Sequence, residues 1–298
     1  MPEDVTFLPR SEVLTFEEIA RFVRVAAELG IDKIRLTGGE PLVRKDLHKL
    51  VRMIAAVPGI TDIGLTTNGL LLADQAAALH DAGLRRLNVS LDTLDPSRFR
   101  ELTRRDGLDK VLAGFNAARR LGFAPIKVNA VAIRGYAEHD VVPLARYCRD
   151  RGFSLRFIEY MPIGAEAWER DKVFTAAEIL DRISHEVGAL KEMNSDPTAP
   201  SADYEYLDGS GQVGVIASVS KPFCASCNRL RLTADGKLRN CLFAREESDA
   251  RGLLRSASES DDDLKNLIRT SVWKKWAGHD FNTAGFVKPD RTMHTIGG

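Results

Sequence analysis

Three of the four cysteines in this 298-residue chain lie close together near its C-terminal end. Cys224, Cys227 and Cys241 have the spacing C-x2-C-x13-C, and a Cys-x-x-Cys turn can place two thiolates on one metal ion or cluster. The residues between them alternate apolar and polar side chains around Asp235-Gly236, a strong hairpin-turn signal. Pairing across that turn would set Cys241 beside Leu230, about 10 Å of extended strand from Cys227. We therefore expect the three sulfurs to converge.

Two arginines accompany these cysteines. Arg229 and Arg231 fall on the same face of the first hairpin strand, because side chains in a strand alternate with a period of two. Guanidinium groups match the geometry of phosphate, so the pair indicates an anionic ligand beside the cysteines.

The cysteines could serve three purposes. A disulfide is disfavoured because no other feature marks the chain as secreted. A structural zinc ion normally takes four ligands, and His279 or His294 would have to supply the fourth. A [4Fe–4S] cluster held by three cysteines leaves one iron open to a ligand. Spacing alone leaves both zinc and a cluster open.

The overall composition is ordinary for a globular protein, with 44% hydrophobic and 28% charged residues. Forty-two basic residues balance forty-two acidic ones, so no global field favours nucleic acid or an anionic membrane. The N-terminal residues do not resemble a signal peptide, and no apolar run reaches the roughly 18 residues of a membrane span. We expect a protein of the reducing cytoplasm, with Cys148 packed in the core.

The first half of the chain alternates between helical and strand patterns. Thr15 and Glu18 form a capping-box signal for the first helix, and Gly30 ends it. Helices are expected over residues 15–29, 46–57, 73–82, 109–121 and 138–151, and strands over 33–37, 63–68, 87–92, 126–133 and 155–160. This alternation indicates βαβ units with a parallel sheet, which right-handed crossovers would curl into a whole or partial barrel.

Polar residues gather where these strands end, at the edge where ligands bind in α/β barrels. Each residue alone is more typical of a turn or a cap, whereas the whole set indicates a site. The set comprises Thr37, Thr66, Thr67, Asn68, Ser90, Asp92, Asn129 and Glu159, followed by Met161.

The pattern changes after Pro162. A helix is expected over 175–187, a linker over 194–201, short antiparallel strands over 204–219 and a last helix over 259–277. Residues 279–298 show no helical or strand period, so we expect a disordered tail.

Several motifs are shared with one enzyme family. Gly38-Gly39-Glu40-Pro41 after a strand resembles the glycine-rich motif with which radical S-adenosylmethionine (SAM) enzymes contact the methionine amino group. Together with TTNG, NVSLDT, KVN, EYMPIG, NRLRLTADGKLRNCLF and a Gly-Gly terminus, it makes the chain resemble the GTP 3′,8-cyclases, the family of molybdenum cofactor biosynthesis protein A. The resemblance covers nearly the whole chain.

This resemblance implies an α/β fold of a particular kind. Residues 1–195 would form an incomplete (βα) TIM-type barrel that lacks its first strand. Residues 196–298 would form a C-terminal iron–sulfur and GTP-binding domain that closes the open side of the barrel.

The resemblance also implies roles for individual residues. Cys224, Cys227 and Cys241 would hold a C-terminal [4Fe–4S] cluster whose open iron binds the guanine of GTP. GTP would contact Arg35, Thr66, Lys127, Arg229, Leu230 and Arg231, and SAM would contact Gly39, Ser90 and Met161. Gly297 and Gly298 would match a tail that reaches into the active site, and they are the only candidates for a catalytic role.

One motif of the family is missing. Radical enzymes of this kind hold an N-terminal [4Fe–4S] cluster with Cys-x3-Cys-x2-Cys, and residues 1–298 contain no such spacing. Because that cluster delivers the electron that cleaves SAM, we expect the chain as given to be inactive. Met1 could be an internal methionine, the sequence could be truncated, or the chain could be an inactive paralogue.

The implied function is that of a radical lyase that converts GTP to 3′,8-cyclo-7,8-dihydro-GTP, the first step of molybdopterin synthesis. Its expected partners are GTP, an electron donor and cyclic pyranopterin monophosphate synthase as the next enzyme, without nucleic acid or membrane; a homodimer stays open. Alternatives are a peptide-modifying radical SAM enzyme with an auxiliary cluster, a non-catalytic zinc-stabilised GTP-binding protein, and a structural remnant that binds nothing.

Overall fold

The computed structural model describes residues 8–163, 168–194, 196–275, 286–287, 289 and 291–297. Its α-helices are α1 (Phe16–Ala27), α2 (Leu47–Ala55), α3 (Leu72–Asp81), α4 (Pro96–Thr103), α5 (Leu108–Arg120), α6 (Val141–Arg151), α7 (Ala176–Glu186), α8 (Ala250–Arg255), α9 (Asp261–Trp273) and α10 (Met293–Ile296). Its strands are β1 (Lys33–Leu36), β2 (Asp62–Thr67), β3 (Arg86–Ser90), β4 (Ile126–Ala132), β5 (Ser154–Glu159), β6 (Leu190–Glu192), β7 (Ala202–Tyr206), β8 (Gln212–Ile216), β9 (Arg231–Leu232), β10 (Lys237–Arg239) and β11 (Ser248–Asp249).

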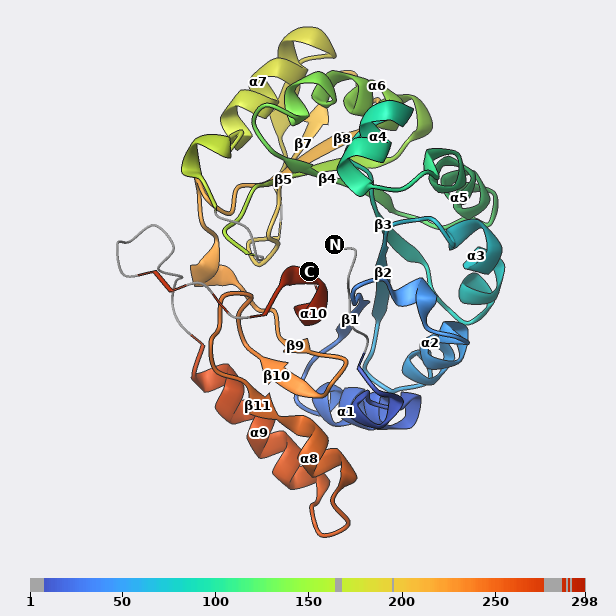
Figure 1. The fold of residues 1–298 in the computed structure, drawn as a ribbon, viewed down its shortest axis with the longest axis vertical. Coiled ribbons are helices and arrows are strands. Elements are labelled where there is room, and N and C mark those ends of the chain that lie inside the picture. Colours follow the sequence, from blue (N-terminus) through green and yellow to red (C-terminus); the bar gives the residue numbers. More distant parts are fainter. Residues whose placement is uncertain are drawn as a thin grey trace.

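Strands β1 to β8 form one curved sheet in the order β1-β2-β3-β4-β5-β8-β7-β6. Strands β1 to β5 and β8 run parallel, whereas β7 and β6 are added antiparallel at the far edge. Figure 1 shows the sheet as an arc with the helices from α1 to α7 around its outer side and the C-terminal segment at its open side. The predicted partial (βα) barrel is confirmed.

The period-two alternation of the strands explains how the sheet divides its two faces. Leu65, Leu87, Val128 and Leu155 are almost completely buried and belong to the large apolar core that joins the sheet to its outer helices. Side chains one position before or after them point to the inner face. The same alternation therefore builds the core and delivers polar groups to the inside of the barrel.

Local capping signals set several helix boundaries. The predicted capping box at α1 is present: the Glu18 NH donates to Thr15 Oγ1 at 3.1 Å, and the Thr15 NH donates to Glu18 Oε2 at 2.7 Å. Helix α4 was not predicted, because Phe99 is its one buried residue and it carries little apolar period. It begins instead from an N-cap at Asp95, whose carboxylate accepts from the Arg98 NH at 2.9 Å.

The strands expected over 204–219 are present, and β7 pairs antiparallel with β8 as predicted. Strand β8 also pairs in parallel with β5, so this segment extends the barrel sheet. The predicted division between residues 195 and 196 falls between β6 and β7, two strands of that sheet. The division into two domains stays a prediction.

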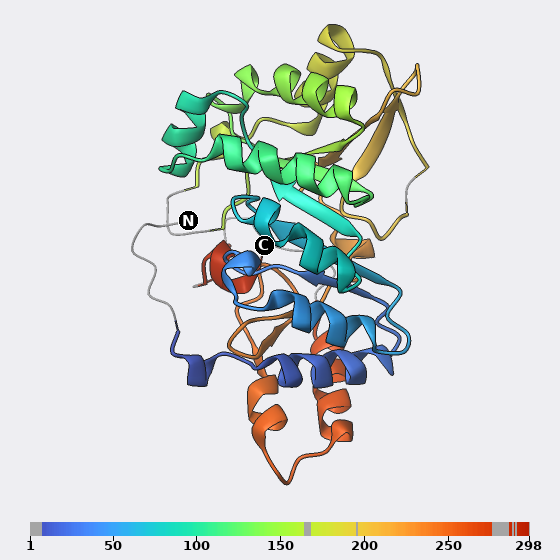
Figure 2. The same cartoon turned by 90° about the vertical axis from the view of Figure 1, so that its right-hand side faces the viewer.

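The C-terminal part is fastened to helix α1. A second apolar cluster joins Phe22 and Val25 of α1 to Leu238, Leu264 and Ile268. In the side view, the helix pair α8 and α9 (orange) lies beyond α1 (Figure 2).

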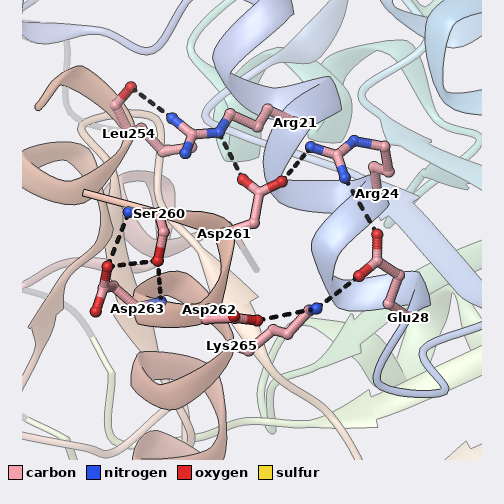
Figure 3. A network of polar contacts seen from close by, with 9 residues as sticks. All are labelled: Arg21, Arg24, Glu28, Leu254, Ser260, Asp261, Asp262, Asp263 and Lys265. Carbon is pink, nitrogen blue, oxygen red and sulfur yellow. Dashed lines mark hydrogen bonds and ion pairs between the residues drawn. The ribbon is translucent and has the colours of Figure 1, made fainter. Parts of the chain in front are cut away.

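Ion pairs between α1 and α9 run along the edge of this cluster (Figure 3). The Asp261 carboxylate accepts hydrogen bonds from Arg21 Nε at 2.9 Å and from Arg24 Nη2 at 2.6 Å. Lys265 Nζ lies 2.9 Å from Glu28 Oε2. Apolar packing and charge pairing together hold α9 at a defined position beside the open side of the barrel.

The end of the chain differs from the prediction. Residues 293–296 form the short helix α10, where no regular structure was expected, and Ile296 is almost completely buried. Figure 1 places α10 inside the arc, between β1 and the β9–β10 hairpin. Tertiary packing therefore orders a segment that has no period of its own. Among the described residues, no helix is long and apolar enough to cross a membrane.

Candidate functional site

The inner face of the sheet carries two neighbouring rows of polar side chains. In one row, Thr66 of β2 lies beside Asn88 of β3, and Asn88 lies beside Lys127 of β4. The second row, nearer the C-terminal ends of the strands, contains Ser90, Asn129 and Arg156. Register between parallel strands thus brings the predicted residues Thr66, Lys127 and Ser90 onto one surface.

This surface is accessible and strongly positive. Arg35 and Ser90 are exposed although they lie on the concave side of the sheet. Loss of hydration against the surrounding protein is the largest cause that lowers the pKa of Arg35 to about 10, and the charges of Arg86, Arg156 and Arg229 add to the shift. Burial, followed by the charge of Arg156, lowers the pKa of Lys127 to about 8. These cations repel one another, so an anionic ligand would be stabilised here.

Two of these cations, Arg86 and Arg156, were missed by the sequence analysis. Both could have been found by continuing the period-two alternation along β3 and β5. Arg86 pairs with Asp62, and Arg156 Nη2 lies 3.2 Å from Asp203 Oδ1. Among the described residues, no carboxylate lies within ion-pair distance of Arg35 or Lys127, so the inner face keeps a net positive charge.

A glycine makes room for the Arg156 pair. Asp203 Oδ1 also accepts a hydrogen bond from Ser201 Oγ at 2.6 Å, and Gly214 of β8 lies opposite Asp203. A Cβ atom at Gly214 would come within 2.5 Å of both oxygens. The glycine therefore lets Asp203 hold Arg156 against the inner face.

The predicted glycine-rich motif is fixed to the end of β2 by one carboxylate. Glu40 accepts hydrogen bonds from the Leu42 NH at 3.0 Å, from Thr67 Oγ1 at 2.7 Å and from the Asn68 NH at 2.7 Å. The loop that carries Gly39 is thereby held against the neighbouring strand end.

The three predicted SAM residues all lie at the C-terminal edge of the sheet. Gly39 follows β1, Ser90 ends β3 and Met161 follows β5. Met161 packs against the same small apolar cluster as Cys241, so this edge meets the cysteine hairpin. Their roles as ligands stay predictions.

Glu159, which also belongs to the predicted strand-end set, has a structural environment. Its carboxylate accepts from the backbone NH groups of Ala176, Val219 and Ser220 at 2.8–2.9 Å and from Ser220 Oγ at 2.5 Å. With its oxygens satisfied, this carboxylate ties the end of β5 to α7 and to the loop after β8.

The cysteine hairpin forms with a register one residue away from the prediction. Leu238 pairs with Leu232, and Arg239 pairs with Arg231, so Cys241 falls level with Arg229 instead of Leu230. The loop has three residues because Gly236 adopts a φ of +78° and donates its NH to the Thr233 carbonyl at 2.9 Å. The prediction had assumed a two-residue turn.

The Cys227 thiol lies among cationic donors. Its sulfur accepts from Arg229 Nε at 3.4 Å and from Lys275 Nζ at 3.3 Å. Burial alone would raise the pKa of Cys227. The Arg229 backbone NH, the Arg229 guanidinium and Lys275 outweigh burial and lower the pKa to about 7. This thiol is prepared to act as a thiolate ligand.

Arg231 lies between the cysteines and has an unused donor. Burial, with the charge of Arg229, lowers its pKa to about 10, while Cys241 and Cys227 oppose that shift. Its Nε is buried and has no hydrogen-bond partner among the described residues. A guanidinium with a buried, unsatisfied NH beside two thiols fits an anionic group such as an iron–sulfur cluster or a phosphate.

The cysteine arrangement also bears on the choice of metal. In the part of the chain that the structure describes, no three His, Cys, Asp or Glu side chains are placed to hold one metal ion. A [4Fe–4S] cluster takes each thiolate on a different iron, and the expected convergence of the three cysteine sulfurs on one cluster stays a prediction. His279 lies outside the described residues, as does the side chain of His294. All four cysteines are free of disulfides.

The described end of the tail reaches the inner side of the barrel. A Cβ atom on Gly297 would lie 2.5 Å from Thr37 Oγ1, and Gly297 has a φ of +73°, so both space and conformation favour glycine. Gly297 is therefore in contact with the residue that follows β1. Gly298 lies outside the described residues.

Comparison with known proteins agrees with this geometry. Residues 2–148 match the Radical SAM superfamily, and residues 153–281 match the family described as Molybdenum Cofactor Synthesis C. A GTP 3′,8-cyclase from Rhodopirellula baltica is 47% identical over 304 residues, covering 100% of this chain and 84% of that protein. The chain belongs to the GTP 3′,8-cyclase family. Another family member, from Corynebacterium glutamicum, is 46% identical over 309 residues and covers 99% of this chain and 81% of its own length.

A solved structure supports the fold of this GTP 3′,8-cyclase family member. Native anSMEcpe with bound AdoMet superposes with a TM-score of 0.56 at 14% identity, over 90% of this chain and 76% of that one. Membership of the radical SAM superfamily implies a [4Fe–4S] cluster and SAM as cofactors.

Proposed function

We propose that this chain binds GTP against the inner face of the barrel and belongs to the machinery that converts GTP to 3′,8-cyclo-7,8-dihydro-GTP. The observation that carries this proposal is the group formed by Arg35, Lys127 and Arg231. Their pKa values are all lowered, and none of them has an ion-pair partner among the described residues. Arg35 and Lys127 are both repelled by Arg156, and a triphosphate would relieve that repulsion, whereas Arg231 is repelled by Arg229 beside the cysteines.

The residues divide the work of holding the substrate. Arg35 and Lys127 are suited to the triphosphate, while Arg229 and Arg231 lie beside the cysteines and would orient the purine end. Thr66 would add a hydroxyl contact, and Leu230 an apolar one. Their main contribution is positioning, because a radical must meet one C–H bond and be kept away from water.

The cofactors would occupy two neighbouring places. Cys224, Cys227 and Cys241 would hold a [4Fe–4S] cluster with one iron open to the guanine, and Gly39, Ser90 and Met161 would contact SAM. An N-terminal [4Fe–4S] cluster, whose Cys-x3-Cys-x2-Cys motif residues 1–298 do not contain, would reduce SAM and so supply the radical that removes hydrogen from C3′ of GTP. Gly297, against Thr37, would close the site from the C-terminal side.

The proposal also includes a cellular compartment and partner proteins. The step would lie in the cytoplasm, where thiols stay reduced, with an electron donor and with cyclic pyranopterin monophosphate synthase as the consumer of the product. Residues 1–298 contain no Cys-x3-Cys-x2-Cys spacing, so the expectation that they form no 5′-deoxyadenosine from SAM stays a prediction. Chromatography after anaerobic incubation with dithionite tests it.

GTP titration by calorimetry tests the substrate assignment. Arg229→Ala or Arg231→Ala should each weaken binding by about 1.5–3 kcal/mol, the range for a charge-assisted hydrogen bond. Arg→Lys should recover only part, because an ammonium cannot reproduce the guanidinium fork. Arg120→Ala, at an exposed position at the end of α5, is the matched control. Unchanged affinity in both hairpin variants would refute the assignment.

Metal analysis tests the cluster. The chain reconstituted anaerobically should contain one [4Fe–4S] cluster, and Cys224→Ala, Cys227→Ala or Cys241→Ala should abolish it. Cys148→Ala should retain it, because Cys148 is buried in α6 and belongs to the main apolar core. Stoichiometric zinc without acid-labile sulfide would contradict the cofactor assignment.

A further inference from the structure

Lys275, just after helix α9, is held against the cysteine hairpin by two contacts. Its ammonium group lies 3.3 Å from Cys227 Sγ and donates to the Arg229 backbone carbonyl at 2.8 Å. The same group thus touches one predicted cluster ligand and the backbone of one predicted GTP contact. No motif in the sequence marked this lysine.

The position of Lys275 is defined by its helix. Helix α9 begins at the Ser260–Asp263 capping box and is fastened to α1 through Asp261 and Lys265. Its side chains Leu264 and Ile268 are buried in the cluster shared with α1. The ammonium therefore comes from a rigid element outside the cysteine loop.

We propose that Lys275 is a positioning residue for the C-terminal cluster. It donates an N–H···S hydrogen bond to the Cys227 sulfur of the bound cluster and holds the Arg229 backbone in the orientation that presents its guanidinium to the nucleotide. This inference rests on the proposed function, because it presupposes the cluster on Cys224, Cys227 and Cys241.

Two consequences follow from the charge of Lys275. Hydrogen bonds and positive charge at a ligand sulfur stabilise the reduced cluster, which carries the extra electron, more than the oxidised one. Lys275 should therefore raise the reduction potential. Because partners of metal ligands typically contribute about 10–100-fold to metal affinity, it should also slow the loss of iron to a chelator.

The neighbouring lysine provides a matched control. Lys274 is mostly exposed, and its nearest acidic partner, Glu246, lies 3.9 Å away. Lys274→Met and Lys275→Met make the same chemical change one residue apart, and Lys275→Arg keeps a charged donor. Lys275→Gln, a neutral donor, gives a second measurement if Lys275→Met does not fold, as judged by circular dichroism.

The experiment measures the cluster, not turnover. Each variant of residues 1–298 is reconstituted anaerobically, its iron and sulfide are counted, and its midpoint potential is determined by optical titration with dithionite. We expect Lys275→Met to have a more negative potential and to lose iron to a chelator about 10–100-fold faster, with Lys274→Met like wild type and Lys275→Arg between them.

A binding measurement tests the link to Arg229. Lys275→Met and Arg229→Ala should each weaken GTP binding, and the double variant should lose less than the sum, because both changes remove the same contact. Additive losses would overturn the Arg229 part of the inference.

The outcomes separate this inference from the function on which it rests. Wild type without iron and sulfide would overturn the cluster assignment itself. Wild type with a cluster, but with the same potential and iron retention in Lys275→Met and Lys274→Met, would overturn only the role of Lys275.

Discussion

Two groups of basic side chains in this protein have opposite surroundings. The unpaired cations, Arg35 and Lys127 on the inner face and Arg231 on β9, have no ion-pair partner among the described residues, and their pKa values are lowered. The paired arginines, Arg239 and Arg291, are matched by Asp235 in the hairpin turn and by Glu247 just before β11. Arg239 is 2% exposed and bonds to Glu247 and to the Ala244 carbonyl.

The second paired arginine completes this network. Arg291 binds both oxygens of Asp235, at 3.0 and 2.8 Å, and also contacts Glu247 at 2.8 Å. It lies two residues before α10, so the pair fastens the tail to the hairpin turn. Arg239 and Arg291 thus have acidic partners in the described part of the chain, whereas Arg35, Lys127 and Arg231 have none there.

The largest effect is expected from breaking the paired group. Arg239→Met should lower the free energy of unfolding by about 3 kcal/mol, because the Ala244 carbonyl loses its donor and Glu247 keeps only Arg291 as a partner. Urea denaturation measures it, and the exposed Arg245→Met is the control. A loss no larger than that of the control would show that the buried pair is not structural.

The inner-face group should respond in the opposite way. Arg35→Met should weaken GTP binding by about 1.5–3 kcal/mol and should not lower the stability of the ligand-free protein, since it removes a repelled charge. Calorimetry and urea denaturation of the same preparation give both numbers. A stability loss comparable to that of Arg239→Met would show that Arg35 also stabilises the fold, which contradicts the proposed difference between the two groups.

The lowered pKa of Lys127 should make GTP affinity depend on pH. Because its pKa is about 8, GTP affinity should fall above pH 8, by up to about tenfold per pH unit, as the free protein loses this charge. Lys127→Met should bind GTP more weakly, and its affinity should lack the pH dependence that the lysine causes. Comparing the two proteins therefore separates the ionisation of Lys127 from that of GTP. A wild-type profile parallel to that of Lys127→Met would rule out Lys127 as a phosphate contact.

The free energy of unfolding of the ligand-free protein should rise over the pH range in which GTP affinity falls. Between pH 8 and the ordinary lysine pKa of 10.5, the unfolded chain holds this proton and the folded chain does not. The contribution of Lys127 to the free energy of unfolding therefore rises with pH over that interval.

The smallest effect is expected at Arg291. Arg291→Lys keeps the charge but loses the two-point contact, so it should cost about 0.5–1.5 kcal/mol. Hydrogen bonds from Arg291, against the opposing effect of burial, lower the pKa of Asp235 to about 2. Its stabilisation is complete above the ordinary value of 3.8 and is lost as pH falls through 2. Acid unfolding of Arg291→Lys should therefore begin at higher pH than in wild type, and identical profiles would contradict the pairing.

Local sequence signals predicted the elements of this fold well. The capping box at Thr15 and the strand alternation depend on residues within a few positions of one another, so they can be recognised without the fold. Recognition of the family motifs pointed to the inner-face residues Arg35, Thr66 and Lys127. Helix α4 was missed because its start depends on a single cap and it has little apolar period.

The features that only the tertiary structure decided depend on contacts between distant segments. Strand β8 joins β5 across more than fifty residues, and that pairing is what brings Asp203 to Arg156 and requires Gly214 between them. Lys275 reaches Cys227 because α9 is packed on α1. The sequence by itself determined which residue types were present and where strands and helices could form. Which cations received a counter-charge was decided only by the fold, because a charge is paired or left for a ligand according to what packs beside it.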